Sequence, residues 1–186
     1  HLSYKDGKRV CQGPDVVYYA SAKGLITVYK EDLSVKFLSR ENGLSDISIS
    51  GMHYDSYNDQ LVLIYSDNNI DVIQGEEVYN LPFIKSNTNI NGSKNINDLL
   101  ITDGSEAYMA TDFGILGFDL KKLEFPFTTF TDKKVYSIVT LGKTVYAGTD
   151  SGLYTVASDG VNITDFNTWQ KAGPDKGLPE GAPVRF

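Results

Sequence analysis

The stretch that decides the fold is residues 145–154, Val145-Tyr146-Ala147-Gly148-Thr149-Asp150-Ser151-Gly152-Leu153-Tyr154. This pattern predicts a short strand, a tight turn that ends at Gly152, and a second strand that starts at Leu153. Three earlier segments repeat it: residues 17–25 (VYYASAKGL), 62–70 (VLIYSDNNI) and 107–115 (AYMATDFGI). The chain therefore contains an internal repeat whose unit includes a pair of short strands.

Each position of this repeat keeps its chemistry from copy to copy. A large side chain of the kind that packs inward recurs at Tyr18, Leu63, Tyr108 and Tyr146. A hydroxyl recurs at Ser21, Ser66, Thr111 and Thr149. The hairpin turns are expected at Gly24, Asn69, Gly114 and Gly152, because Gly and Asn best tolerate positive φ. These turn residues follow one another at intervals of 45, 45 and 38 positions. Short strands at such a period predict a β-propeller, with one four-stranded sheet, or blade, per repeat.

We therefore predict an all-β chain in which residues 1–186 form a single partial β-propeller of about four four-stranded antiparallel blades. The connection at residues 42–45 (NGLS) recurs in altered form at residues 176–179 (KGLP). A further blade is accordingly expected to begin near residue 183. Propellers use roughly 4 to 8 blades, and closure usually pairs the first and last strands. Since four repeats are followed here by only the first residues of a fifth, we expect this sequence to be part of a larger propeller. Unpaired strand edges would allow two copies to associate edge to edge.

Composition narrows the classes of partner and cofactor. The formal net charge is −7 and the pI is about 4.8, which disfavours binding to nucleic acid or to an anionic membrane through bulk electrostatics. No apolar run approaches the roughly 18 residues that a membrane span needs. Cys11 is the only cysteine, so the sequence predicts neither an intramolecular disulfide nor a cysteine-based metal cluster. We expect no cofactor and no bound metal.

Catalytic patterns are weak, and the sequence favours a non-enzymatic protein. His53 lies two residues before Asp55, on the same face of a predicted strand, but a structural histidine is the simpler interpretation. Asp112 and Asp150 precede turn glycines as in sialidase-type repeats, yet the flanking hydroxyl and aromatic residues of those repeats are missing. We interpret both as side-chain turn formers. Because many carboxylates are present, a polysaccharide-active propeller enzyme stays open as an alternative.

Aromatic side chains provide the strongest compositional indication of a binding surface. The chain has 12 Tyr, 9 Phe and 1 Trp, and such rings stack on sugars while their polar ends stay in water. Most of them belong to the core positions of the repeat. The candidates for an exposed ligand-binding platform lie in or beside predicted loops: Tyr57, Tyr79, Phe83 and Trp169. The polar segment 85–95 is long for a propeller connection and is a second place where function could reside.

The repeat resembles a known family. Asn42-Gly43-Leu44-Ser45-Asp46 and Gly148-Thr149-Asp150-Ser151-Gly152-Leu153-Tyr154 are similar to the two-component regulator propeller repeat of Bacteroidetes, with Tyr or Leu where Trp is usual. Residues 61–73, 80–85 and 94–97 more specifically resemble the N-terminal propeller of PorZ-type proteins of the type IX secretion system.

This resemblance implies a function and a location. PorZ-type proteins consist of two propellers and a C-terminal β-sandwich, and this chain would be part of the first propeller. They are non-enzymatic cell-surface proteins that bind protein partners of a surface secretion complex and are implicated in passing anionic lipopolysaccharide to a sortase. The resemblance thus implies export to the cell surface or periplasm of a Gram-negative bacterium. The alternative is a periplasmic glycan-sensing propeller of a hybrid two-component sensor kinase, which shares the repeat.

Overall fold

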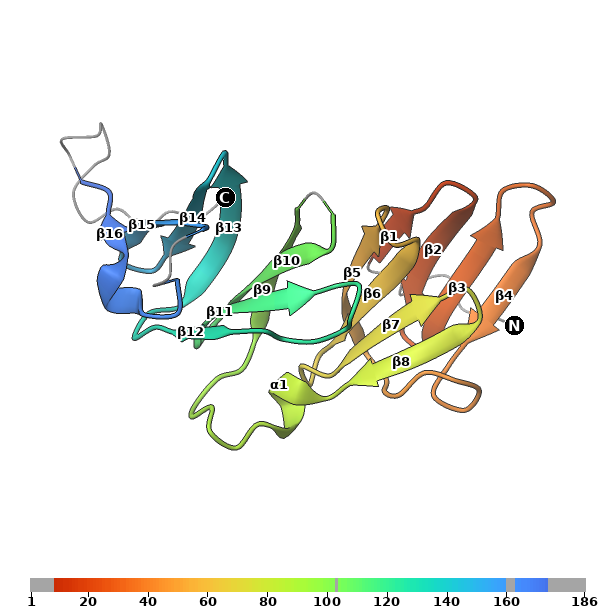
Figure 1. Ribbon diagram of the computed structural model, residues 1–186. Coiled ribbons are helices and arrows are strands. Elements are labelled where there is room, and N and C mark those ends of the chain that lie inside the picture. The colour runs from red at the N-terminus through yellow and green to blue at the C-terminus, as the bar shows by residue number, and fades with distance from the viewer. Residues whose placement is uncertain (1–8, 103, 160–162, 174–186) are drawn as a thin grey trace. The chain divides into compact units, whose positions relative to one another are not determined.

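A computed structural model describes residues 9–102, 104–159 and 163–173, and their secondary structure is almost entirely antiparallel sheet (Figure 1). These residues divide into two compact units, with the division between Asn87 and Thr88. Each unit holds two four-stranded sheets, which confirms the all-β, four-bladed prediction. The further blade expected near residue 183 lies outside the described residues.

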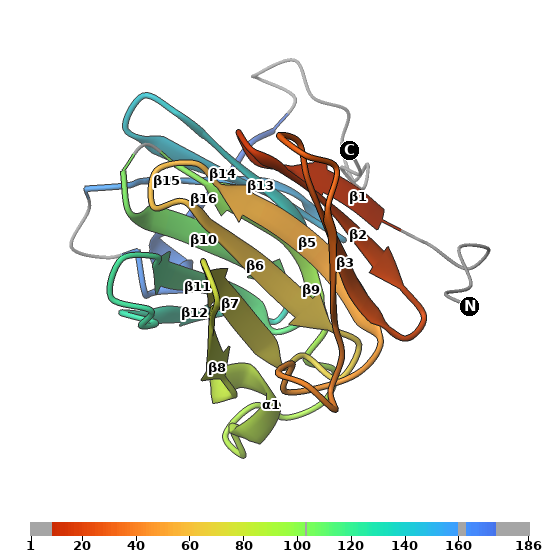
Figure 2. The same ribbon diagram turned by 90° about the vertical axis from the view of Figure 1, so that its right-hand side faces the viewer.

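The strands of each sheet follow one another in chain order, side by side, as Figure 2 also shows. The first unit contains β1 (Arg9–Gln12), β2 (Val16–Ser21), β3 (Gly24–Tyr29) and β4 (Val35–Leu38), then β5 (Ile49–Asp55), β6 (Gln60–Tyr65), β7 (Ile70–Gln74), β8 (Glu77–Leu81) and the short helix α1 (Phe83–Ser86). The second unit contains β9 (Ile96–Ile101), β10 (Glu106–Thr111), β11 (Gly114–Asp119) and β12 (Thr128–Phe130), then β13 (Val135–Leu141), β14 (Thr144–Thr149), β15 (Gly152–Ala157), the 3-10 turn η1 (Phe166–Thr168) and β16 (Gln170–Lys171).

Each unit buries its own hydrophobic core between its two sheets. In the first unit Leu25 of β3 packs in one cluster with Leu61 and Leu63 of β6. In the second unit Ile115 of β11 packs with Val145 and Ala147 of β14. The alternation of apolar residues along the strands predicts this burial, because successive side chains of a strand point to opposite faces.

Three of the four hairpins show why the repeat keeps a hydroxyl and a glycine three positions apart. The Thr111 Oγ1 hydroxyl donates to the Gly114 carbonyl over 2.7 Å and accepts from the Gly114 N–H over 2.9 Å. Thr149 and Ser21 donate in the same way to the carbonyls of Gly152 and Gly24. The three glycines have φ values between +124° and +152°, a region that L-residues rarely adopt.

The hairpin of the second copy, between β6 and β7, is built differently. The residue with positive φ is Asn68, at +66°, and not Asn69, which was expected to occupy that conformation. The Asn68 N–H donates to the Tyr65 carbonyl and the Tyr65 N–H donates to the Asn69 carbonyl, so the loop is one residue longer than in the other copies. This extra residue directs the Asn69 side chain into a polar network.

That network surrounds the fully buried carboxylate of Asp71. Oδ2 of Asp71 accepts from the Tyr65 hydroxyl at 2.6 Å and from the Ser45 N–H at 2.8 Å, while Oδ1 accepts from Asn80 at 3.0 Å. Asn80 also donates to Asn69 Oδ1. Every buried polar group named here has a partner, so the network stabilises the loop before β5 against β7 and β8.

An ion pair joins α1 to the same sheet. The Lys85 ammonium lies 2.6 Å from Asp46 Oδ2 and 2.5 Å from Asp67 Oδ2. Burial alone would raise the pKa of Asp46, but the hydrogen bonds from Lys85 and from the Ile47 N–H outweigh it, so the pKa lies well below its usual range. The folded state therefore favours the ionised form of Asp46.

We expect this ion pair to contribute stability that disappears in acid. Because the pKa of Asp46 is lower in the folded than in the unfolded chain, its contribution is present above about pH 4 and is lost as the pH falls below that value. Asp46→Asn should cost less than about 1 kcal/mol at pH 6, because the Lys85 ammonium is 42% exposed, and this difference should shrink at pH 3. Urea unfolding at both pH values measures this difference in the free energy of unfolding. The control is Glu41→Gln, which removes an exposed carboxylate. A difference that is the same at both pH values would contradict the assignment.

Candidate functional site

The four aromatic residues predicted to form a platform differ in exposure. Tyr57, Tyr79 and Phe83 are exposed at 53%, 42% and 40%. Trp169 is only 6% exposed, so the expectation that it presents an exposed ring is wrong. Its Nε1–H donates to the Ile163 carbonyl at 3.1 Å and its ring lies 5.9 Å from that of Phe166. Trp169 is a core residue because the 3-10 turn folds its large apolar ring onto β14.

The three exposed rings do not meet in one site. Tyr57 lies in the turn between β5 and β6, at the start of β6. Phe83 lies in α1 beyond the end of β8, where Leu81 pairs with Ile70 close to the end of β6. The six residues of β6 separate these two ends by about 20 Å. Tyr79 lies between them on the edge strand β8. The structure therefore offers three separate rings rather than one platform. The role of these rings in ligand binding stays a prediction.

Asp55, which the sequence places on the same strand face as His53, has a structural role, while the structural interpretation of His53 itself stays a prediction. Asp55 is fully buried. Its Oδ1 accepts from the Tyr57 N–H, and its Oδ2 accepts from the side chains of Asn58 and Gln60, each at 2.8 Å. Tyr57 and Asn58 lie in the β5–β6 turn, and Gln60 is the first residue of β6. The carboxylate therefore orders that turn.

The second unit contains a groove that the sequence analysis did not identify. It has a volume of about 480 Å³ and lies at the end of β12, where the 89–93 segment passes the β10–β11 hairpin. We call it the Phe130 groove. Polar side chains of the 89–93 segment line one side, charged side chains of the β12–β13 connection line the other, and two phenylalanines complete it: Asn89, Asn91, Ser93, Asp132, Lys133, Lys134, Phe113 and Phe130.

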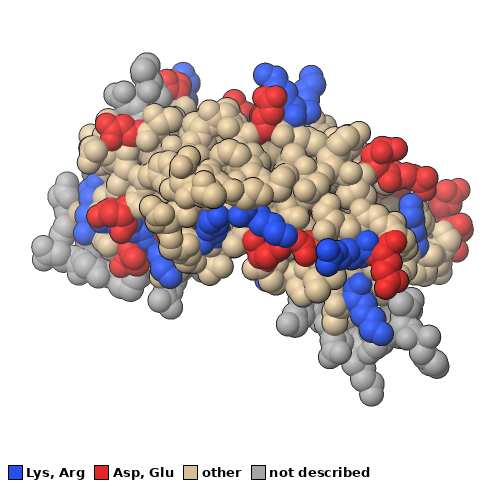
Figure 3. All heavy atoms as spheres, turned by 90° about the horizontal axis from the view of Figure 1, so that it is seen from below, with Lys and Arg blue, Asp and Glu red and all other residues tan. Residues whose placement is uncertain are grey.

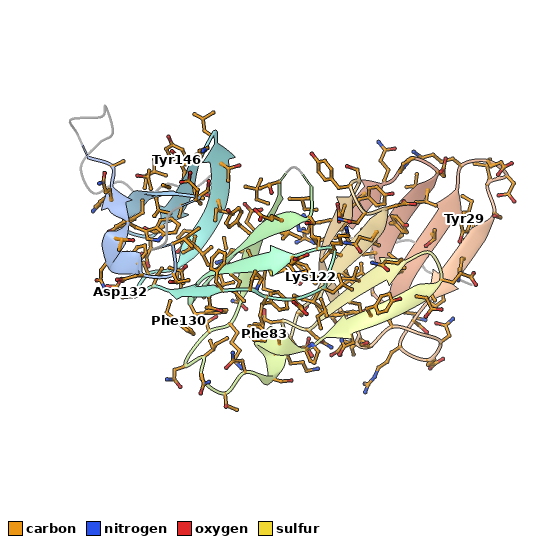
Figure 4. The ribbon with its side chains drawn as sticks, viewed as in Figure 1. Tyr29, Phe83, Lys122, Phe130, Asp132 and Tyr146 are labelled. Atoms are coloured by element: carbon orange, nitrogen blue, oxygen red, sulfur yellow. The ribbon has the colours of Figure 1, made fainter. Side chains whose placement is uncertain are left out.

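Phe130 is the aromatic platform of this groove. Its side chain is 54% exposed, whereas Phe113 beneath it is 6% exposed, and the two ring centroids are 6.2 Å apart. The Thr131 N–H donates to the Phe113 carbonyl, which holds the residue after Phe130 against the β10–β11 hairpin. Figure 4 shows Phe130 and Asp132 at the end of β12. A buried ring thus supports an exposed one, so a ligand can stack on Phe130.

Asp112 connects the two sides of the groove. Its carboxylate accepts hydrogen bonds from Ser93 at 2.6 Å and from Asn97 at 3.0 Å, and the Lys134 ammonium lies at 3.4 Å. Burial opposes ionisation of Asp112, but these partners outweigh it and lower the pKa. The sequence pattern favours a side-chain turn former at Asp112. The structure shows instead that it binds the 93–97 segment to its hairpin.

The remaining charges of the groove are paired as well. Lys133 lies 2.9 Å from Asp132, and this ammonium lowers the pKa of the Asp132 carboxyl. The Lys134 N–H donates to Asp150 at the neighbouring hairpin. Basic and acidic side chains also lie beside one another over the face shown in Figure 3. The groove therefore suits a polar ligand with a flat face, such as a sugar ring, better than a strongly charged one.

Three further findings concern the whole described part of the chain. Within it, no group of three or more His, Cys, Asp or Glu side chains is placed to hold a metal ion. Neither of its short helices is long and apolar enough to cross a membrane. Four carboxyl groups in these residues have a shifted pKa, and in each of them the pKa is lowered: Asp32, Asp46, Asp112 and Asp132.

The sequence and fold are similar to those of known proteins. The family model for the PorZ N-terminal β-propeller domain of the secretion system TSS9 matches residues 17–170. A search of curated protein sequences finds no match. Among solved structures, PorZ of Porphyromonas gingivalis, an essential bacterial surface component of its type-IX secretion system, superimposes with a TM-score of 0.83 at 27% identity. That similarity covers 92% of this chain and 23% of PorZ.

Two other solved structures share the fold at low identity. The extracellular domain of a putative hybrid two component system from B. thetaiotaomicron has a TM-score of 0.69 at 17% identity, over 97% of this chain and 24% of that one. AztD from Citrobacter koseri has a TM-score of 0.62 at 14% identity, over 82% of this chain and 44% of that one. At such identities the similarity shows the propeller fold alone. This chain spans about a quarter of the length of PorZ and of the two component system domain.

Proposed function

Because the chain belongs to the PorZ N-terminal β-propeller domain family, we propose that it is a non-enzymatic binding domain of an exported, surface-located component of a type IX secretion system. The observation that carries this proposal is the family match over residues 17–170, to which the fold similarity to PorZ adds. The domain would act by holding partners in place, and its parent protein would come from a Gram-negative bacterium of the Bacteroidetes.

The electrostatics of the carboxylates supports a non-enzymatic role. A glycoside hydrolase needs a carboxylic acid with a raised pKa to protonate the leaving group. Asp112 and Asp132 of the Phe130 groove have lowered pKa values, because donors and ammonium groups stabilise their charged forms. Ionised carboxylates of this kind accept hydrogen bonds from a ligand and do not deliver protons at neutral pH.

The Phe130 groove is the proposed contact site for lipopolysaccharide or for the polar surface of a protein partner. Phe130 offers a ring on which a sugar can stack, and Asn91, Ser93 and Thr131 contribute polar side chains around it. Since Lys133 and Lys134 already lie against carboxylates, the groove would bind the sugar portion of lipopolysaccharide and not its anionic groups.

Substitution of Phe130 tests this site. Phe130→Ala should weaken binding of the chain to vesicles that contain lipopolysaccharide about fivefold, because ring stacking is worth on the order of 1 kcal/mol. Leu141→Ala, which removes an exposed apolar side chain of β13 in the same unit but outside the groove lining, is the control. Co-sedimentation with the vesicles measures the binding of both variants. Equal loss in the two variants would place binding outside the groove, and no loss in Phe130→Ala would remove Phe130 from the site.

The family role is tested in the parent protein. A photo-crosslinking amino acid at Asp132, whose side chain is 77% exposed, should join the parent protein in its own bacterium to lipopolysaccharide or to another secretion component. Cell fractionation should place that parent protein at the outer surface. If it fractionates with the inner membrane together with a kinase domain, the sensor interpretation replaces this proposal.

A further inference from the structure

The first unit contains a second cavity, between its two sheets at the end where β5 turns into β6. Its volume is about 260 Å³. Three tyrosines, Tyr18 of β2, Tyr29 of β3 and Tyr54 of β5, form its walls, and we call it the tyrosine cleft. Leu38 and Ile73 contribute apolar surface to the lining. Neither the family match nor the repeat pattern points to this cleft.

The aromatic walls are held in place by their neighbours. The rings of Tyr18 and Tyr54 stack with centroids 6.3 Å apart and planes inclined by 28°. Gly13 lets the Tyr54 ring approach the chain, because a Cβ on Gly13 would lie 2.7 Å from that ring. Tyr29 is 37% exposed at the end of β3 (Figure 4). The Tyr18 and Tyr54 rings are therefore fixed by their neighbours, while the Tyr29 ring borders the opening of the cleft.

Carboxylates dominate the charge of the cleft. Three acids, Asp15, Asp59 and Glu76, line it together with one base, Lys36. The Lys36 ammonium is already bound to Glu76 at 3.0 Å. Asp59 accepts a hydrogen bond from the Tyr54 hydroxyl, and within the described residues no side chain is bound to the Asp15 carboxylate. Within the described residues, no ammonium or guanidinium group is therefore bound to the Asp15 or Asp59 carboxylate beside the tyrosine rings.

The tyrosine hydroxyls respond to this negative field. Burial raises the pKa of Tyr18 to about 12, and the charge of Asp59 contributes to the shift. Burial, the hydrogen bond to Asp59 and the charges of Asp59 and Asp15 raise the pKa of Tyr54 further. Both tyrosine side chains are consequently neutral at physiological pH and present electron-rich ring faces inside the cleft.

The geometry points to the tyrosine cleft as a site for a cationic side chain, a lysine or arginine of a partner protein. An ammonium or guanidinium group is attracted to the faces of aromatic rings within about 6 Å, and the Asp15 carboxylate can pair with it at the opening. The volume, below the roughly 300 Å³ at which small-molecule sites begin, suits a single side chain. This inference goes beyond the proposed function and does not depend on the secretion role.

Charge complementarity decides between the possible occupants. An anion such as a phosphate would meet Asp15, Asp59 and Glu76 with only the paired Lys36 to receive it, so repulsion disfavours it. A neutral sugar could stack on Tyr29 but would bring no positive charge to the Asp15 and Asp59 carboxylates. A protein with the chain's net charge of −7 also attracts basic partners over a distance.

A peptide titration tests the proposal. The 186-residue chain, with its tyrosine rings labelled with ¹³C, is titrated by NMR with the blocked peptide acetyl-Gly-Arg-Gly-amide. We expect saturable shifts of the Tyr29 and Tyr54 ring signals. Asp15→Asn and Tyr29→Ala should each weaken binding about five- to tenfold, because each removes one of the two attractions for the cation. Tyr29→Phe keeps the ring face and should bind within about twofold of the parent chain.

The controls distinguish the alternatives. The same peptide with Glu in place of Arg should cause no saturable shift, and neither should glucose. Saturation by the Glu peptide, saturation by glucose, or no saturation by the Arg peptide would each overturn the proposal. Asp15 is exposed, so Asp15→Asn remains informative even if Tyr29→Ala lowers stability, and circular dichroism verifies that each variant is folded. A negative result leaves the family-based proposal unchanged, because that rests on a different site.

Discussion

Gly114→Ala is expected to lower the free energy of unfolding by about 3 kcal/mol. Gly114 opens β11 with a φ of +146°, which an L-residue adopts only with strain. A Cβ at this position would also lie 2.0 Å from the Thr129 carbonyl oxygen of β12, and a backbone atom cannot move aside as a flexible side chain can. Relief of the contact would separate β12 from β11, and β12 carries Phe130.

Gly142→Ala is the matched control for this prediction. Gly142 lies in the same unit, in the β13–β14 turn, with a φ of +58°, but a Cβ there would meet no atom within 4 Å. Its substitution should therefore cost only the conformational term, about 1 kcal/mol. Trp169, the single tryptophan, is buried in the second unit and reports its unfolding in urea by fluorescence. Equal losses in the two variants would show that the backbone contact at Gly114 does not limit stability.

Asp71→Ala is expected to cost about 3 kcal/mol in the first unit, because it removes the shared acceptor of a buried network. The Tyr65 hydroxyl and the Ser45 N–H would both lose their partner at Asp71. Burial and the hydrogen bond to Asp71 raise the pKa of Tyr65, so its hydroxyl stays protonated and continues to need an acceptor. The measurement is urea unfolding followed by far-ultraviolet circular dichroism.

A double-mutant cycle tests whether this cost comes from the network. Tyr65→Phe alone should cost about 1 kcal/mol, since it leaves the carboxylate with its other two donors. In the Asp71→Ala background the same change should be nearly neutral, because the hydroxyl has already lost its acceptor. If the two losses simply add, the two groups are energetically independent and the network assignment is wrong.

The hairpins show how far local sequence predicts structure. A hydroxyl followed three residues later by glycine predicted the hairpins of three copies, because the Thr or Ser side chain bonds within its own turn. In the second copy Ser66 occupies the hydroxyl position, but it donates to the Ser48 carbonyl, and the loop is one residue longer. The longer loop accompanies the buried Asp71 network, whose partners Ser45 and Asn80 lie outside this hairpin.

The candidate site was less predictable than the fold. The aromatic composition indicated a binding surface, yet Phe130 was overlooked because it occupies a strand of the repeat and not a loop. One signal was available: an aspartate follows the hydroxyl position in three copies, at Asp67, Asp112 and Asp150. Asp67 and Asp112 each pair with a lysine of a later connection, Lys85 and Lys134. Such a repeated acid marks where a connection binds to a hairpin.

The sequence by itself determined the all-β class, the number of four-stranded sheets in the described residues and the positions of their hairpins. These follow from interactions within about ten residues, namely alternation along a strand and turn chemistry, which repeat in every copy. Tertiary structure decided that Trp169 is buried, that Phe130 is exposed beside the buried Phe113, and that three tyrosines line a cleft together with the Asp15 and Asp59 carboxylates. Exposure and charge pairing depend on neighbours from other strands, and no local pattern records those neighbours.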